Sequence, residues 1–248
     1  MTLRRSLAAV IAAGAMTLSI AACTSQSTTP EATTSAPSSA APSPEASPEA
    51  ETSSAPSAPA DVDPNNTTVP IVRDLSYDGT PLEVMHGAPL TDILISAAEQ
   101  VNQLDLTVKP PECEHAFVPQ TGNTADYKNV DIAMAANASG ISVSASQDFA
   151  VQRRNVDIAR EFPAICPSVD LTVAGAPATI TVEKVETPIS GADDAFGYSM
   201  VNGENPPQYT LYATKGDYIL MVQSGMQASS PNVAALTELL QTMTERIP

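Results

Sequence analysis

The residues Tyr209-Thr210-Leu211-Tyr212-Ala213-Thr214-Lys215-Gly216-Asp217-Tyr218-Ile219-Leu220-Met221-Val222 decide the fold of the C-terminal part of the chain. Apolar side chains alternate with other residues on both sides of one glycine: Tyr209, Leu211 and Ala213, then Tyr218, Leu220 and Val222. A period of two is typical of β-strands, and a two-residue turn with glycine joins antiparallel neighbours. We therefore predict a β-hairpin with Lys215-Gly216 as its tight turn.

The same alternation recurs earlier in the chain and predicts more strands. The candidates are 130–134 and 141–145 around Asn137-Ala138-Ser139-Gly140, 169–173 and 180–182 around Gly175-Ala176-Pro177, 196–201, and a short extended piece at 106–108. Short strands separated by turn residues are typical of antiparallel sheets. The segment 69–87 mixes apolar and turn residues, and we interpret it as an entry arm with one short strand.

Three segments carry the helical period instead. The first follows Thr91 as N-cap, with a stripe of Leu94, Ala97, Ala98, Val101 and Leu104. The second is capped by Asp148 and ends at Pro163, and the third is capped by Ser230 with Pro231 at its first position. The fold class expected is α+β, with an antiparallel β-sheet packed by about three helices.

The N-terminus has the features of an export signal that ends at a cysteine. Arg4 and Arg5 precede an apolar run, Leu7 to Ile20, which is shorter than the ~20 residues of a bilayer span. Small residues then precede Cys23, as in the lipobox of bacterial lipoproteins. That resemblance implies a signal peptide at 1–22, fatty-acyl chains such as palmitate on Cys23, and a place on the outer face of the cell membrane. The alternative is an ordinary secretory signal with a chance cysteine.

Residues 23–68 follow as a lipidated cysteine and a Ser/Thr/Pro/Ala-rich tether, which leaves 69–248 as the folded domain. The tether has no apolar period, so burial cannot offset the entropy of ordering it. Its reach is on the order of 100 Å if it is extended. The domain carries 22 Asp and Glu against nine Lys and Arg, a net charge of −13. That balance argues against a nucleic-acid partner, which needs clustered basic residues.

Three cysteines occur in the chain, and lipid on Cys23 would leave Cys113 and Cys166 as an even pair. Disulfides persist in exported domains, so we expect these two to be joined. Two free thiols remain an alternative. Another is a metal site with Glu112, Glu114 and His115, although adjacent residues rarely converge on one ion.

No catalytic motif is recognisable, and we assign no catalytic residue, cofactor or metal site. His86 is interpreted as a turn or edge residue, and Asp193-Asp194 as a solvated turn. Tyr198 and Tyr212 are weak candidates for lining a ligand groove. Their place in alternating strands favours a role in the core.

The order of these pieces resembles a known family. The lipobox, the tether, Pro111-Glu112-Cys113, and the helix that ends with Glu161-Phe162-Pro163-Ala164-Ile165-Cys166 resemble actinobacterial cell-envelope lipoproteins. Their domain is similar to the extracellular sensor domain of mycobacterial PknH-type serine/threonine kinases, over about residues 88–248. The resemblance implies an α+β sandwich with a cleft and no established enzymatic activity. This chain has no tryptophan, and it has no cysteine near Phe196 or Gln223, where the family's second disulfide would lie.

The leading hypothesis is a lipid-anchored, non-enzymatic envelope protein that binds an unknown ligand or protein outside the membrane. One rival is an envelope hydrolase with a site near Asp193 and Asn202-Gly203-Glu204. The other rival is a structural accessory subunit of an envelope complex.

Overall fold

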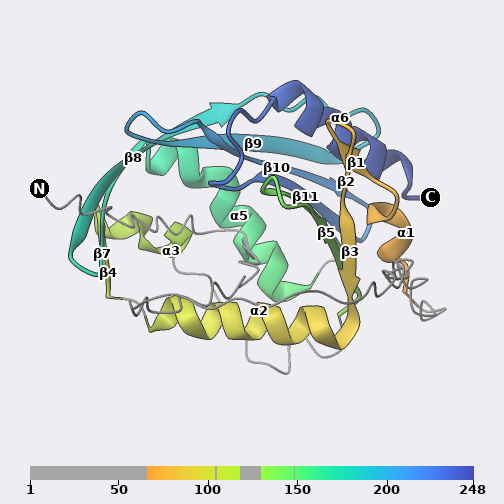
Figure 1. The fold of residues 1–248 in the computed structure, drawn as a ribbon, viewed down its shortest axis with the longest axis horizontal. Helices are drawn as coiled ribbons and strands as arrows, with labels where there is room; N and C mark the ends of the chain where they lie inside the picture. Colours follow the sequence, from red (N-terminus) through yellow and green to blue (C-terminus); the bar gives the residue numbers. More distant parts are fainter. Residues whose placement is uncertain (1–65, 104, 118–129, 148) are drawn as a thin grey trace, which may run out of the picture. The chain divides into compact units, whose positions relative to one another are not determined.

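A nine-stranded antiparallel sheet forms the centre of the computed structural model of this protein (Figure 1). The structure describes residues 66–103, 105–117, 130–147 and 149–248. The strands of the sheet are β3 (Glu83–His86), β4 (Leu106–Lys109), β5 (Ile132–Ala136), β6 (Ile141–Gln147), β7 (Ser168–Val173), β8 (Ala176–Val185), β9 (Asp194–Asn202), β10 (Gln208–Lys215) and β11 (Tyr218–Ser224). Their order is β3-β5-β6-β11-β10-β9-β8-β7-β4, and β1 (Ser76–Tyr77) and β2 (Thr80–Pro81) form a separate small ribbon.

The helices are α1 (Val69–Val72), α2 (Gly87–Asn102), α3 (Glu114–Phe117), α5 (Ala150–Ile165) and α6 (Val233–Glu245), with the 3₁₀ turn η1 (Pro111–Cys113) before α3. Three of those described have 13 residues or more, and two are single turns. The α+β class with a large antiparallel sheet is thus confirmed.

The central hairpin forms as its alternation predicts, with a turn one residue later than expected. Lys215 pairs with Tyr218, so the two turn residues are Gly216 and Asp217. Gly216 has φ +54°, a conformation that glycine adopts without steric cost. The β7–β8 hairpin is shifted in the opposite direction, because Val173 pairs with Ala176 and leaves Ala174-Gly175 as its turn, earlier than the predicted Gly175-Ala176-Pro177.

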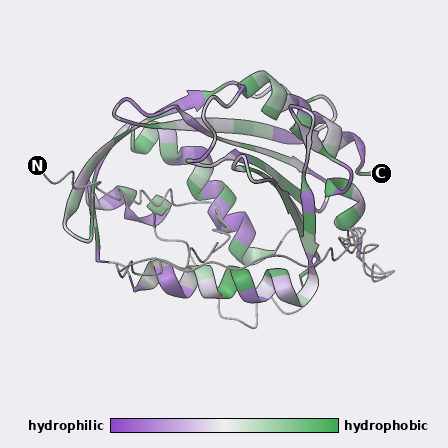
Figure 2. Cartoon of the chain, in the orientation of Figure 1, coloured by the Kyte–Doolittle hydropathy of each residue, from purple (hydrophilic) through white to green (hydrophobic). Residues whose placement is uncertain are grey.

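Alternation along the strands divides the core between the two faces of the sheet. Leu211, Leu220 and Val222 are buried in a cluster with residues of α1 and α6. Their neighbours Tyr212, Ile219 and Met221 are buried in a second cluster with residues of α3 and α5. Hydrophilic and hydrophobic residues are interspersed along α2 and α5, as expected for helices that are buried on one side (Figure 2).

Helix ends differ from the predictions in three places. The second helix continues past Pro163 to Ile165, and the Cys166 amide donates to the Phe162 carbonyl at 2.8 Å. The last helix is capped by Asn232 rather than Ser230, because the Asn232 Oδ1 accepts from the Ala234 and Ala235 amides. The first begins at Gly87, and Thr91 lies inside it.

Several predicted details fall outside the described residues. The cap at Asp148, the stripe residue Leu104 and the side chains of Ala98 and Val101 belong to this group. The entry arm holds more structure than one strand, because α1, β1, β2 and β3 all lie within it.

Candidate functional site

Tyr198 and Tyr212 lie in the core and do not line an open groove. Each ring is 1% exposed, because β9 and β10 turn them toward α5. The Tyr198 ring meets Phe162 edge-on with centroids 5.4 Å apart, and the Tyr212 ring stacks on Phe196 at 5.0 Å. Burial raises the pKa of Tyr198 to about 12, and a hydrogen bond with Thr210 partly opposes that shift. Burial also raises the pKa of Tyr212 well above its usual value, and the charge of Tyr198 adds to the shift.

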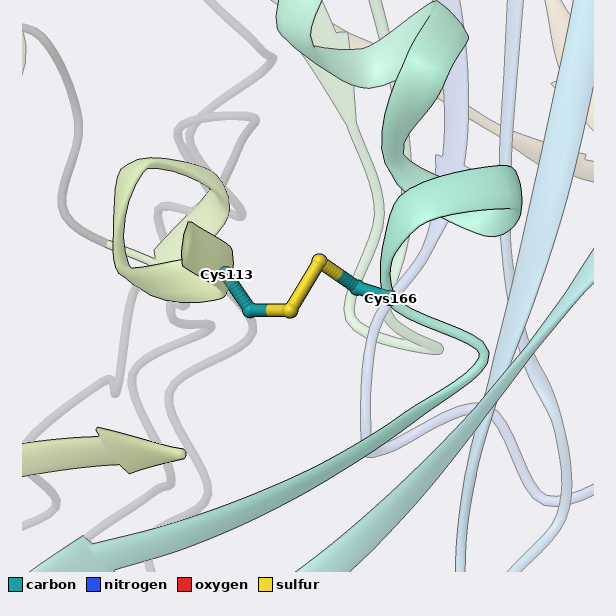
Figure 3. The surroundings of a disulfide bond; sticks show 2 residues. All are labelled: Cys113 and Cys166. Atoms are coloured by element: carbon teal, nitrogen blue, oxygen red, sulfur yellow. A yellow bond between two sulfur atoms is a disulfide. The ribbon is translucent and has the colours of Figure 1, made fainter. Parts of the chain in front are cut away.

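Cys113 and Cys166 are joined by a disulfide bond in the structure (Figure 3). Their Cα atoms are 5.8 Å apart, and both side chains are buried, at 0% and 2% exposure. The bond connects η1 to the C-terminal end of α5. Glu112, Glu114 and His115 are exposed beside it. In the described ranges no group of three His, Cys, Asp or Glu residues is placed to hold a metal ion.

The residues considered for hydrolysis are spread over the sheet. His86 ends β3 at one edge, and Asp194 begins β9, five strand positions away in the sheet. The Asp193 carboxylate accepts the Gly216 amide at 2.7 Å and so closes the central hairpin turn. Asn202 and Glu204 belong to a turn in which the Asn202 carbonyl accepts from the side chain of Asn205. The hydrogen bonds of Asp193 and of the Asn202 carbonyl each hold a turn in place.

A cleft of about 230 Å³ lies between α5 and the β10–β11 hairpin. Arg153, Asp157 and Arg160 of α5 form one wall, and Thr214, Gly216 and Tyr218 of the hairpin form the other, with Val156 and Ile219 between them. The three charged residues fall at i, i+4 and i+7, which places them on one face of a helix. Val156 and Ile219 are buried, so the cleft has an apolar floor under polar walls.

Arg160 is held in place from several sides. Its Nε and Nη2 donate to the Asp194 Oδ2 at 3.1 and 2.6 Å, and its Nη1 donates to the Asp157 Oδ1 at 3.0 Å. The guanidinium also lies over the Phe196 ring, 5.0 Å from its centroid. The side chain is 43% exposed, so these ion pairs add little to stability. Their effect is to orient both Arg160 and Asp157 along the cleft.

Tyr218 connects the cleft to the start of the described chain. Its hydroxyl donates to the Thr67 Oγ1 at 2.9 Å. Thr67 also donates to Asp131 from both its amide, at 2.5 Å, and its hydroxyl, at 2.8 Å. Tyr218 packs with Leu220 and Val222 against the cluster that α1 and α6 cover, so alternation turns its ring away from the α5 face of the sheet. No predicted site residue lies in this cleft, although the i, i+4, i+7 charges on the second helix are visible in the sequence.

A row of buried polar side chains crosses the sheet beside the aromatic core. Thr210 pairs with Tyr198 on one side and with Gln223 on the other, and the Gln223 Nε2 lies 3.4 Å from the Thr210 Oγ1. Gln223 is 2% exposed, and its Oε1 has no hydrogen-bond partner; the same holds for the Oγ of Ser146. Gln223 interrupts the apolar alternation of its strand. This interruption is the sequence feature from which the buried polar row could have been predicted.

No helix in the described part of the chain has the length and apolar character needed to cross a bilayer.

No protein-family profile and no curated protein matches the chain, but several solved chains are similar to it, among them two mycobacterial ones. An uncharacterised protein of Mycobacterium smegmatis, an ortholog of Rv0999, is 18% identical, with 58% of this chain and 76% of that chain covered and a TM-score of 0.35. The extracellular domain of PknH from Mycobacterium tuberculosis is 12% identical, with 56% and 77% covered and a TM-score of 0.32. The second of these is a domain of the kind that the sequence resemblance names.

Proposed function

We propose that this protein is a lipid-anchored, non-enzymatic binding protein of the cell envelope, and that its ligand occupies the cleft between α5 and the β10–β11 hairpin. The observation that carries the proposal is the fixed geometry of Arg160 and Asp157 over an apolar floor. Polar groups that are already oriented lose little freedom when a ligand binds. A small concave site with a few convergent polar groups is the usual form of a ligand pocket.

Two features of the chain support an extracytoplasmic location. Cys23 ends a signal-like apolar run at the N-terminus, and the buried Cys113–Cys166 disulfide suits an oxidising compartment. In this proposal the lipid on Cys23 holds the protein at the outer face of the membrane, and residues 24–65 act as a spacer, because Thr67 and Thr68 are hydrogen-bonded to Asp131 of the domain.

The anchor is tested with a Cys23→Ser variant of the full chain. We expect wild-type protein in the membrane fraction, with a mass that includes acyl groups, and the variant in the soluble extracellular fraction. The Cys113–Cys166 bond reports on folding of the variant and should be unchanged. A variant that stays in the membrane fraction after its signal is cleaved would refute lipid anchoring.

The binding site is tested by amide hydrogen exchange on the full chain, with and without a low-molecular-mass extract of envelope material. Protection is expected at α5 and at the β10–β11 hairpin. An Arg153→Gln variant should lose that protection, whereas Arg154→Gln should keep it, because Arg154 is the neighbouring arginine and does not line the cleft. Protection that is equal in both variants, or that falls on other elements, would place binding elsewhere.

A further inference from the structure

We infer that the cleft between α5 and the β10–β11 hairpin takes a neutral polyhydroxylated ring, that is, a single saccharide unit. The inference rests on the proposed binding function and names the chemical class of the ligand. Three properties of the walls carry it: the mixture of hydrogen-bond donors and acceptors, the balance of charge, and the shape of the apolar floor.

The walls offer donors and acceptors side by side. The Arg153 and Arg160 guanidinium groups can only donate, the Asp157 carboxylate can only accept, and the Thr214 hydroxyl does both. A sugar hydroxyl also donates and accepts, so neighbouring hydroxyls of one ring can bond to a guanidinium and a carboxylate together. A carboxylate ligand offers acceptors only, and a phosphate adds negative charge beside the Asp157 carboxylate, whereas a neutral sugar brings hydroxyl donors without added charge.

The charges of the cleft are already balanced before a ligand arrives. Arg160 is paired with both Asp157 and Asp194, at 3.0 and 2.6 Å. Counting Arg153 with these three residues gives two positive and two negative groups. The domain as a whole has a net charge of −13, which opposes the approach of an anion. Because these four charges balance one another, the cleft gives neither a cation nor an anion a net attraction, and this favours a neutral ligand.

The size and floor of the cleft suit one ring. A volume of about 230 Å³ is below the ~300–1,000 Å³ of sites for drug-sized ligands. Val156 and Ile219 provide the apolar floor, and the Tyr218 ring packs on the other face of the sheet with Leu220 and Val222. The C–H faces of a pyranose or furanose can pack on that floor while the hydroxyls at its rim reach the polar walls.

Saturation-transfer NMR on the full chain, in micelles of a detergent without a sugar headgroup, tests the inference. The probes are neutral methyl glycosides of hexoses and pentoses, with inorganic phosphate and acetate titrated in parallel by chemical-shift change. An Asp157→Asn variant separates the ligand classes by the sign of its effect. For a sugar, the substitution takes away a hydrogen-bond acceptor in the cleft, so binding should weaken. For an anion, it takes away a repelling negative charge, so binding should tighten. Glu161→Gln is the control, because Glu161 is an exposed carboxylate of α5 that does not line the cleft.

We expect at least one glycoside to bind, with affinity at least tenfold weaker in Asp157→Asn and within twofold of wild type in Glu161→Gln. Unchanged thermal unfolding of both variants would show that they are folded. Phosphate or acetate binding that tightens in Asp157→Asn would overturn the saccharide class and leave the binding function standing. Glycoside binding that ignores Asp157→Asn, or no binding by any glycoside, would also overturn the inference. The proposed function itself fails only if the hydrogen-exchange experiment also shows no protection at the cleft.

Discussion

At the scale of single residues, the two buried tyrosines of the core predict how the domain responds to alkali. Burial raises the pKa of Tyr198 to about 12, against an ordinary value near 10. The unfolded chain therefore loses its tyrosine proton at a lower pH than the folded chain does. Stability is thus fully present below pH ~10 and falls as pH rises from there toward about 12. Denaturant unfolding at a series of alkaline pH values should show this decline.

A Tyr198→Phe variant isolates that effect. It keeps the edge-on contact with Phe162 and removes the ionisable hydroxyl, so its stability should fall less steeply between pH 10 and 12. The direct measurement is phenolate absorbance, in which one late-titrating tyrosine of the wild type should disappear. Tyr209 is half-buried and serves as the control position. The matched variant Tyr209→Phe should leave the late titration in place. Identical profiles for wild type and Tyr198→Phe would contradict the assignment.

Gly197 shows what a local pattern cannot reveal at this scale. It lies inside β9, where glycine costs stability relative to residues with a side chain. A Cβ at this position would lie 2.5 Å from the Leu211 Cδ2 and 2.8 Å from the Thr187 Oγ1. The strand was predictable from Phe196 to Val201. The need for glycine depends on Leu211, whose position is set by the register between β9 and β10.

At the scale of elements, the sequence predicts pieces whose partners are near in the chain. The hairpins β5–β6, β7–β8 and β10–β11 follow from two-residue alternation and turn residues alone. Pairing of β11 with β6 joins segments about 70 to 80 residues apart, and no local pattern encodes it. The cleft depends on a similar long-range fact, because it needs α5 to lie over the β10–β11 hairpin. The charged residues of α5 could be found from the sequence, but their position opposite the β10–β11 hairpin could not be predicted from it.

The entry arm predicts a stability effect at its junction with the sheet. Asp131, just before β5, accepts from the Thr67 amide, from the Thr67 hydroxyl and, at 2.6 Å, from the Thr68 hydroxyl. Thr68 is fully buried, so an Asp131→Ala change would leave polar groups of the junction without their acceptor. We expect a loss of about 1–3 kcal/mol in the free energy of unfolding, measured with urea.

Two observations separate this effect from general damage to the domain. An Asp92→Ala substitution at an exposed position of α2 should change the unfolding free energy by no more than ~0.5 kcal/mol. Hydrogen exchange should speed up at the amides of Thr67 and α1 in Asp131→Ala and stay slow in β10. If Asp131→Ala were as stable as wild type, the junction would not be holding residues 67–72 on the sheet.

At the scale of the whole molecule, the disulfide ties together parts of the fold that contribute to one core. Cys113 and Cys166 are buried in the cluster that holds Phe117, Phe162 and Tyr198. The bond closes a loop of 53 residues, which includes β5, β6 and α5. A covalent constraint on the unfolded chain suits the proposed location, because disulfides persist in oxidising compartments.

The double variant Cys113→Ser/Cys166→Ser should therefore be less stable than wild type by about 4 kcal/mol, the chain-entropy value for a loop of this length. Urea unfolding of the full chain, compared between the oxidised wild type and the double variant, measures this difference in the free energy of unfolding. Because both sulfurs are buried, a mild reductant should leave the native bond intact and cleave it readily once denaturant is added. Reaction with a thiol reagent before and after unfolding measures this. Rapid reduction in the native state would mean that η1 and the end of α5 separate easily, and equal unfolding free energies for wild type and double variant would contradict the expectation of about 4 kcal/mol.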